Sequence, residues 1–440
     1  MGPKEYLLEA YRLYHGEGVP KDLAAALKSF HKAAQLGDPQ ARHFLGIMYL
    51  KGEGAPQDLA EALKWTRLAA QGGVPAAQTN LGLMHLGGVG AAKDEREGAK
   101  WLRLAADAGV SEAAFNLARI LLEGRILPQN HPEALKLLRQ AAEDGFVQAR
   151  YLLGVMLAEG LGTPRNDLEA IKWIRLAAEK GFVEGQYSLA MMFLCGRGAP
   201  QDPAEALKWM RKAAQGGLDR AQFNLAAIYH SGLGVDRDYA EALKWYQTAA
   251  ERGHVPARHA LGVMHENGQG VSVDFALAEK WHRSAAEKGF APSQFRLGQM
   301  ALEGQGLPQD ELEAARWIKL AALEGFAPAQ AKLGDLCEKG QGLPQDYAEA
   351  LKWRRLAADQ GDSEAASALA NMHELGLGVP KDDLEAAKWR KAAAKKGYSS
   401  SQGDLADLAE LQSDGKDSSI LTELANLIEL KNARPGPGKH

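Results

Sequence analysis

Three observations predict an all-α solenoid of about eleven 36-residue helix-turn-helix repeats. An Ala-Ala pair recurs every 36 residues, from 33–34 to 393–394, without an insertion. Apolar residues follow helical spacing within each copy. All nine tryptophans share one position of the repeat: Trp65, Trp101, Trp173, Trp209, Trp245, Trp281, Trp317, Trp353 and Trp389. A strict period of this length is typical of stacked units that cannot bury their apolar faces alone.

The second helix of each repeat is predicted by stretches such as that from Asp346 to Gly361. Asp346 is an N-cap, and Glu349 three residues later completes the signature of a capping box. Gly361 stands where a left-handed C-cap is expected. Between them, Ala350 and Trp353 begin one apolar stripe, so we expect a helix of about four turns with the tryptophan in the core.

The first helix of each repeat is illustrated by residues 219–231, in which Ala221 and Leu225 begin the packing stripe. The leucine position never breaks between Leu45 and Leu405. The residue after it is always Gly or Ala, which allows a neighbouring helix to approach closely. Each repeat is therefore expected to be a closely packed helix pair.

The predicted solenoid spans residues 4–398 and begins with a degenerate capping helix at 4–16. Residues 399–431 are predicted to form a degenerate repeat and a C-terminal capping helix that shields the last repeat. This helix is indicated by apolar residues at helical spacing: Ile420, Leu421, Leu424, Leu427 and Ile428. Residues 432–440 are rich in Pro, Gly and basic side chains, and we expect a disordered tail.

Composition narrows the class of protein. The net charge of −4 and the pI near 6.3 argue against the basic surface that nucleic acid requires. The two cysteines, Cys195 and Cys337, are too few for a disulfide framework and fit a reducing compartment. No apolar run reaches the roughly 20 residues of a membrane span. We expect a monomeric cytoplasmic protein, or a periplasmic or secreted one if a signal peptide was removed from the natural chain.

The repeat pattern A-x-x-x-L-G-x-x-Y-x-x-G-x-G-x-x-x-D-x-x-x-A-x-x-W-x-x-x-A-A-x-x-G resembles the Sel-one-like (Sel1-like) repeat family, a relative of the tetratricopeptide repeats. The resemblance covers residues 5 to about 412. It implies a right-handed superhelix whose first helices line a concave face. It also implies an adaptor or scaffold that holds other proteins.

No pattern in the sequence indicates catalysis, a metal or a cofactor. The recurrent Gly-x-Gly turn lacks the preceding strand and the Lys-Ser/Thr pair of a phosphate loop, so it is interpreted as a turn before an N-cap. His254, His259 and His265 are the densest histidine group, but their spacing places them on different helix faces. We expect packed histidines, no cofactor and no metal site.

Three first-helix columns match the groove-lining positions of tetratricopeptide-like repeats. The first carries rings in the middle repeats: Phe115, Tyr151, Tyr187, Phe223, His259 and Phe295. The other two are mainly apolar early in the chain, including Leu86, Leu122 and Leu194. They become acidic toward the C-terminus, at Glu266, Asp335, Glu338 and Glu374. The groove thus changes from apolar to acidic along the chain.

These columns lead to the hypothesis that the groove binds an extended or helical segment of another protein. The rings would act as anchors, and the acidic end would meet Lys or Arg of the ligand. The alternative for the rings is packing between repeats. Two other functions stay open: a dedicated inhibitor or immunity protein for one toxin, and an enzyme acting on glycans or peptidoglycan through a site assembled from several repeats.

Overall fold

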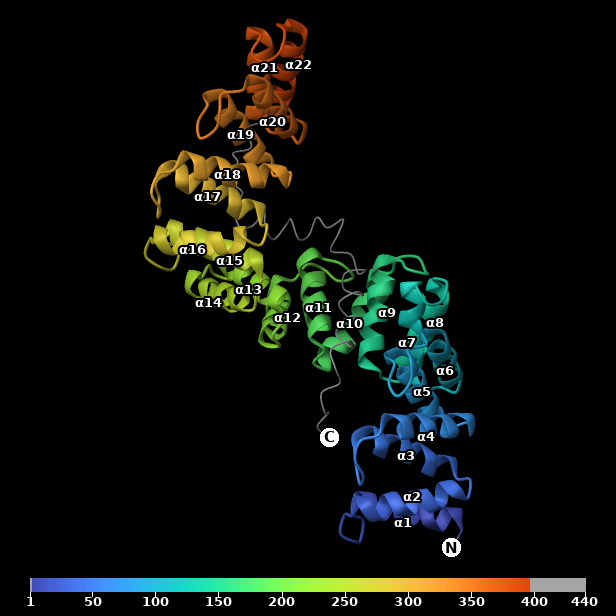
Figure 1. The fold of residues 1–440 in the computed structure, drawn as a ribbon. Helices are drawn as coiled ribbons and strands as arrows, with labels where there is room; N and C mark the ends of the chain where they lie inside the picture. Colours follow the sequence, from blue (N-terminus) through green and yellow to red (C-terminus); the bar gives the residue numbers. More distant parts are fainter. Residues whose placement is uncertain (1, 396–440) are drawn as a thin grey trace. The chain divides into compact units, whose positions relative to one another are not determined.

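The computed structural model describes residues 2–395, and this range consists of 22 α-helices joined by turns, without a strand. The chain divides into two compact units, which are described separately. Unit 1 comprises residues 2–201 and unit 2 residues 202–395 of the described range. The predicted capping helix at 399–431 and the tail at 432–440 lie outside the described residues. Figure 1 shows the helices in order.

Nearly all helices have the same length of 13 residues, as expected from a strict repeat. Unit 1 contains α1 (Pro3–His15), α2 (Leu23–Gln35), α3 (Pro39–Lys51), α4 (Leu59–Gln71), α5 (Pro75–Gly87), α6 (Glu95–Asp107), α7 (Ser111–Glu123), α8 (His131–Glu143), α9 (Val147–Glu159), α10 (Asp167–Glu179) and α11 (Val183–Cys195). Unit 2 contains α12 (Pro203–Gln215), α13 (Asp219–Ser231), α14 (Tyr239–Glu251), α15 (Val255–Asn267), α16 (Phe275–Ala286), α17 (Ala291–Glu303), α18 (Glu311–Leu323), α19 (Ala327–Lys339), α20 (Tyr347–Asp359), α21 (Ser363–Leu375) and α22 (Asp383–Lys395).

Within each unit, a helix packs on the one before it and the one after it in the chain. The odd-numbered helices are the first helices of the repeats, and the even-numbered ones are the second helices. The helix predicted at residues 219–231 is α13, with the same bounds. The prediction of an all-α solenoid is therefore confirmed.

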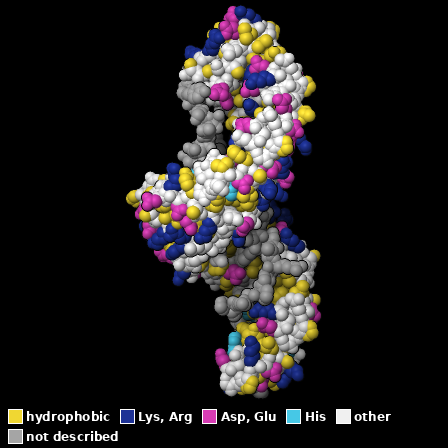
Figure 2. Space-filling view, turned by 90° about the vertical axis from the view of Figure 1, so that its left-hand side faces the viewer, with side chains coloured by type: hydrophobic (Ala, Val, Ile, Leu, Met, Phe, Trp, Pro, Cys, Tyr) yellow, Lys and Arg dark blue, Asp and Glu magenta, His cyan; other side chains and the backbone are white. Residues whose placement is uncertain are grey.

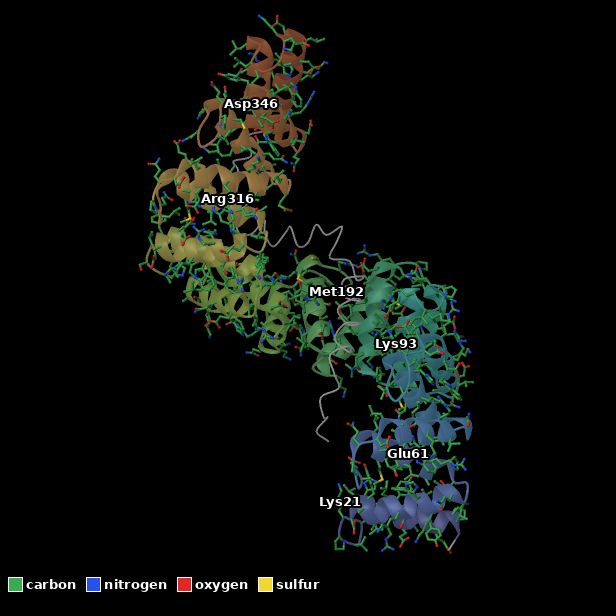
Figure 3. The ribbon with its side chains drawn as sticks, viewed as in Figure 1. Lys21, Glu61, Lys93, Met192, Arg316 and Asp346 are labelled. Atoms are coloured by element: carbon green, nitrogen blue, oxygen red, sulfur yellow. The ribbon has the colours of Figure 1, made fainter. Side chains whose placement is uncertain are left out.

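The predicted N-caps are present, but the capping box is only half formed. The side chain of Asp346, whose position is labelled in Figure 3, accepts hydrogen bonds from the backbone N–H of Ala348 and Glu349 at 2.9 and 3.0 Å. The backbone N–H of Asp346 donates instead to the carbonyl of Cys337, at 2.8 Å. Because that donor is already used, the glutamate side chain does not complete the reciprocal bond, and this part of the prediction is wrong.

The glutamate of this position binds the tryptophan one turn later. In α4, the indole N–H of Trp65 donates to Glu61 at 2.9 Å, and Lys64 pairs with the same carboxylate at 2.8 Å. The same Trp–Glu bond recurs in five other second helices of the described range. The repeated Asp-x-x-Glu-x-x-x-Trp spacing thus fixes the start of the helix and the orientation of the indole ring.

The tryptophan is not the most deeply buried residue of the second helix. Only Trp65 and Trp209 are buried, and the other seven are half-buried. The residue that follows the tryptophan position is exposed at Arg390 but buried in ten earlier repeats: Phe30, Thr66, Leu102, Leu138, Ile174, Met210, Tyr246, His282, Ile318 and Arg354. Its partner is the Gly/Ala position of the first helix, since a Cβ added at Gly154 would lie 2.6 Å from Ile174 Cγ1.

The second glycine of each Gly-x-Gly turn brings neighbouring repeats together. Gly342 has φ of +70°, and a Cβ there would lie 1.9 Å from the carbonyl oxygen of Glu311 in the preceding repeat. Only glycine combines this left-handed backbone with such close contact. This contact explains why the turn recurs and supports the structural interpretation over a phosphate loop.

Candidate functional site: the first-helix face

The ring column predicted to anchor a partner forms pairs between successive repeats. Phe115 on α7 lies 5.2 Å, centroid to centroid, from Phe146, the N-cap residue of α9. Tyr151 on α9 lies 5.1 Å from Phe182, the N-cap residue of α11. The equivalent pairs in unit 2 are Phe223–His254, His259–Phe290 and Phe295–Phe326. Each pair joins residues 31 apart in the sequence, so the column packs one repeat on the next.

The burial of these rings agrees with that packing. Phe115, Tyr151, Phe223 and His259 are buried, whereas Phe295 and Tyr187 are half-buried. Phe223 has no exposed surface at all. A buried ring contributes mainly to the core, so the packing alternative describes what these side chains do in this structure. Their role as anchors stays a prediction.

The two apolar columns of unit 1 form the second part of the predicted groove. We define the apolar strip as Ile47 and Leu50 on α3, Leu83 and Leu86 on α5, Arg119 and Leu122 on α7, Val155 and Ala158 on α9, and Met191 and Leu194 on α11. Successive first helices lie side by side, as Tyr151 Oη and Ser188 Oγ show for α9 and α11 at 3.3 Å. Nine of the ten residues are apolar, and seven of the ten are half-buried; Leu122, Val155 and Ala158 are buried.

Glu266, which was predicted to contact a basic side chain of a partner, already forms ion pairs inside unit 2. Its carboxylate accepts two hydrogen bonds from Nε of Arg296 at 2.8 and 2.9 Å and lies 3.2 Å from Nε2 of His282. His259 stands beside His282 and shares a 2.8 Å hydrogen bond with Ser293. Burial, with smaller electrostatic contributions from the neighbouring His282 and Arg296, holds the pKa of His259 well below its usual value. The sequence-predicted packed histidines are confirmed at this position.

The other acidic residues have internal partners as well. Arg354 donates to Asp335 at 2.7 Å and also to Glu338, and Arg390 donates to Glu374. Arg354 is buried at the position that is leucine or isoleucine in several other repeats. These carboxylates already pair with arginines within unit 2, and their contact with Lys or Arg of a partner stays a prediction.

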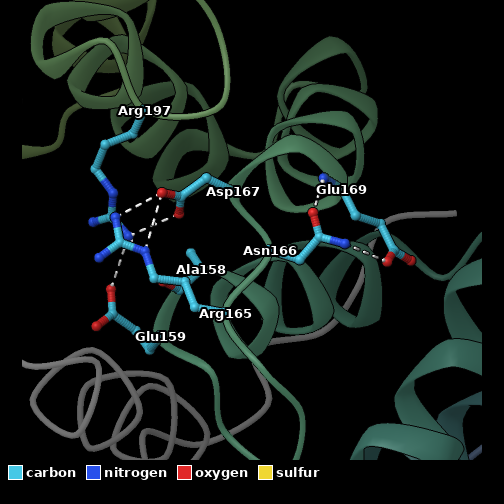
Figure 4. A network of polar contacts seen from close by, with 7 residues as sticks. All are labelled: Ala158, Glu159, Arg165, Asn166, Asp167, Glu169 and Arg197. Atoms are coloured by element: carbon cyan, nitrogen blue, oxygen red, sulfur yellow. Dashed lines mark hydrogen bonds and ion pairs between the residues drawn. The ribbon is translucent and has the colours of Figure 1, made fainter.

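A further polar network lies in unit 1 between α9, α10 and the turn after α11 (Figure 4). Arg197 donates to the carbonyl of Ala158 at 2.9 Å and to Asp167 at 3.1 Å, and Arg165 donates to Asp167 at 2.6 Å. Burial raises the pKa of Asp167, but the hydrogen bonds from Arg165 and Arg197 outweigh it and leave the pKa below its usual value. An aspartate held ionised by two guanidinium groups is suited to joining repeats.

The described residues contain no candidate metal centre. Between residues 2 and 395 there is no group of three or more His, Cys, Asp or Glu side chains that could hold a metal ion. Nor is any helix in this range long and apolar enough to cross a membrane. Acidic and basic side chains are interspersed on the face drawn in Figure 2. What remains as a candidate site is the apolar strip.

The fold and the strip together define a tetratricopeptide-like α-solenoid, a class that typically serves as a non-catalytic scaffold. The Sel1 repeat family model matches eleven consecutive segments covering residues 10–398. The chain therefore belongs to the Sel1 repeat family, whose members are generally protein-interaction scaffolds. No curated protein matches the sequence.

Two solved structures are similar along much of the chain. One is c5321, a protective antigen of uropathogenic Escherichia coli with an SLR fold, with 32% identity, coverage of 100% of this chain and 96% of that one, and a TM-score of 0.78. The other is a Sel1 repeat protein from Oxalobacter formigenes, with 32% identity, coverage of 72% and 90%, and a TM-score of 0.58. The immunity protein PA5088 of Pseudomonas aeruginosa is more distant, with 21% identity, coverage of 48% and 80%, and a TM-score of 0.33. That last similarity carries no argument for the immunity alternative.

Proposed function

We propose that this chain is a non-catalytic scaffold that binds a segment of another protein on the apolar strip of unit 1. The observation that carries the proposal is the composition of the strip, in which nine of ten side chains are apolar across five successive first helices. The same columns in unit 2 carry several acidic residues, whose carboxylates pair with arginines outside the columns. A long apolar surface of this kind is typical of a protein-binding site.

The preferred ligand is an amphipathic helix. A helix presents apolar side chains at i, i+3, i+4 and i+7, which suits a groove lined by leucines at regular intervals. Each methylene group removed from water would contribute about 0.8 kcal/mol. Within the predicted site, we therefore assign partner contact to Leu86, Leu122 and Leu194, and inter-repeat packing to the ring column.

The proposal is tested by paired charge substitutions in the full chain. The Ile47→Lys/Leu83→Lys variant places two charges on half-buried strip positions. The Leu104→Lys/Leu176→Lys variant places the same charges on second helices, where the leucines are 49% and 39% exposed. Proteins captured from host extracts by the wild-type chain are identified by mass spectrometry and then measured as purified partners.

The expected result is a partner whose affinity falls at least tenfold with the strip variant and is unchanged with the second-helix variant. Circular dichroism confirms that both variants are folded. If the strip variant binds every captured partner as tightly as wild type does, the proposed function is wrong.

A further inference from the structure

One side chain of the apolar strip is charged. Arg119 on α7 is the tenth residue of the strip, and the other nine are apolar. The equivalent position of the preceding first helix is Leu83 on α5, and that of the following one is Val155 on α9. Arg119 is therefore a single cation with an apolar residue at the equivalent position of each neighbouring repeat.

The guanidinium of Arg119 has little compensation within the described range. Its Nε is buried and has no hydrogen-bond partner among residues 2–395. Glu123, one turn later on the same helix, accepts a hydrogen bond from Arg125 instead, at 3.0 Å. The guanidinium carbon of Arg119 lies 5.9 Å from the centre of the Phe115 ring. A ring at that distance attracts a cation less strongly than a hydrogen-bonded carboxylate does.

Burial has already removed part of the water around this cation. Burial lowers the pKa of Arg119, and the charge of Glu123 acts in the opposite direction without cancelling the shift. The residue as a whole is half-buried, so the guanidinium still contacts solvent. A ligand that covers the apolar strip would remove that remaining water.

This loss of water makes the chemistry of the ligand matter at one point. An entirely apolar ligand would leave a desolvated cation without a partner, which is unfavourable, and a basic one would add repulsion. A carboxylate in the same place would form charge-assisted hydrogen bonds with the guanidinium. Arg119 thus favours one class of ligand and disfavours the others.

We propose that the apolar strip selects an amphipathic helix with one Asp or Glu inside its apolar face, and that this carboxylate binds the guanidinium of Arg119. The apolar side chains on either side of the carboxylate then cover the apolar residues of the neighbouring first helices. Arg119 determines specificity, whereas the leucines of the strip supply most of the contact area. The inference rests on the proposed function for the identity of the surface.

The probe is a displayed library of amphipathic helices of about 18 residues, or five turns. Every member has a stripe of leucines in which one position is varied, so that each stripe position samples each amino acid. Selection is carried out on the full-length wild type and on Arg119→Glu, Arg119→Met and Arg67→Glu chains. Arg67 is an exposed arginine of the second helix α4, so its variant makes the same change of charge away from the strip.

Wild type and Arg67→Glu should both select Asp or Glu at one stripe position. As a synthetic peptide, the selected helix should bind wild type about tenfold or more tightly than its counterpart with Gln, as measured by fluorescence anisotropy. Arg119→Glu should select Lys or Arg at that position instead. Arg119→Met should bind the two peptides equally, and this variant keeps the test valid if Arg119→Glu does not fold, because methionine replaces the buried chain without its charge.

Three results would overturn the inference. The first is selection of helices without an acidic residue by wild type. The second is an unchanged preference for the acidic peptide in Arg119→Met, which would leave Arg119 a purely structural role beside Phe115. The third is a change of selected charge in Arg67→Glu as large as that in Arg119→Glu, which would assign the preference to the overall charge of the chain.

Failure of the inference is distinguishable from failure of the proposed function. If wild type selects only apolar helices and Ile47→Lys/Leu83→Lys does not bind them, the strip is a binding site without the proposed specificity. If no member of the library binds wild type, or if that strip variant binds every selected helix as wild type does, the proposed function is wrong and the inference is wrong with it.

Discussion

Replacing Phe223 with alanine tests whether the ring column belongs to the core. The ring has no exposed surface and contacts the rings of Tyr246 and His254 at centroid distances of 5.4 and 4.8 Å. Truncation of a fully buried phenylalanine removes its transfer free energy and leaves a cavity, at a cost of about 3–5 kcal/mol. Phe223→Leu keeps most of the volume and should cost less than about 1.5 kcal/mol.

Phe295→Ala is the matched control, because this ring occupies the same column in a later repeat but is half-buried. Its ring contacts that of Phe326 at a centroid distance of 5.6 Å. We expect Phe295→Ala to lower the free energy of unfolding by about 2 kcal/mol, which is half the cost of Phe223→Ala. The difference between the two variants depends on burial alone, since the substitution and the repeat position are the same.

The assay is guanidinium denaturation followed by far-ultraviolet circular dichroism, combined with hydrogen exchange of unit 2. Hydrogen exchange is needed because repeat proteins unfold segment by segment and one transition midpoint averages over them. Loss of protection should concentrate in α13, α14 and α15. If Phe223→Ala costs less than about 1 kcal/mol and no more than Phe295→Ala, the packing interpretation is wrong and the ring is available as an anchor.

Three further predictions concern unit 2 and the turns. Because the pKa of His259 is lowered in the folded state, the unfolded chain takes up a proton near pH 6.5 that the folded chain does not. The free energy of unfolding should therefore decrease as the pH is lowered through that value. His259→Phe should make this decrease smaller, as measured by denaturation at several pH values. Arg354→Met should leave the free energy of unfolding, measured by thermal unfolding, nearly unchanged, because methionine fills the buried space and the half-exposed carboxylates regain water. Arg354→Ala should lower the free energy of unfolding by about 3 kcal/mol, because it leaves that space empty. Gly342→Ala should lower the denaturation midpoint by more than Gly325→Ala, since both have positive φ but only the first meets a backbone carbonyl; equal effects would contradict the close-contact argument.

The sequence sufficed for the fold because its period is strict and each element carries its own boundary signals. The Asp caps, the positive-φ glycines and the Leu-Gly pairs recur at fixed positions. The depth of burial was harder to predict. Trp353 looks like the core residue by size, but Arg354 after it points between the helices, and that direction depends on how the two helices cross.

Part of the site could have been predicted more accurately from the sequence. In five repeats a ring in the first-helix column is followed 31 positions later by an aromatic residue or histidine, as in Phe115 with Phe146 and Phe295 with Phe326, whereas Tyr187 is followed by Leu218 and is an exception. In repeats where the first position is Thr79 or Ala331, no ring follows. This correlation between columns is a signal of packing.

The pairing of the acids could not be predicted from helical spacing. Glu266 and Arg296 lie 30 residues apart on different first helices, and the sequence gives no measure of their separation. The glutamate of the presumed capping box was misassigned for a similar reason. Its reciprocal donor is taken by a carbonyl nine residues earlier, in the preceding first helix.

The central claim, that the apolar strip of unit 1 contacts a partner, is tested most directly by photo-crosslinking. A photoreactive amino acid is placed at Leu83 on α5 or at Leu104 on α6, in otherwise identical full chains. The account predicts crosslinks to the partner from position 83 and none from position 104. Crosslinks from position 104 alone would place the partner on the second helices and contradict the account.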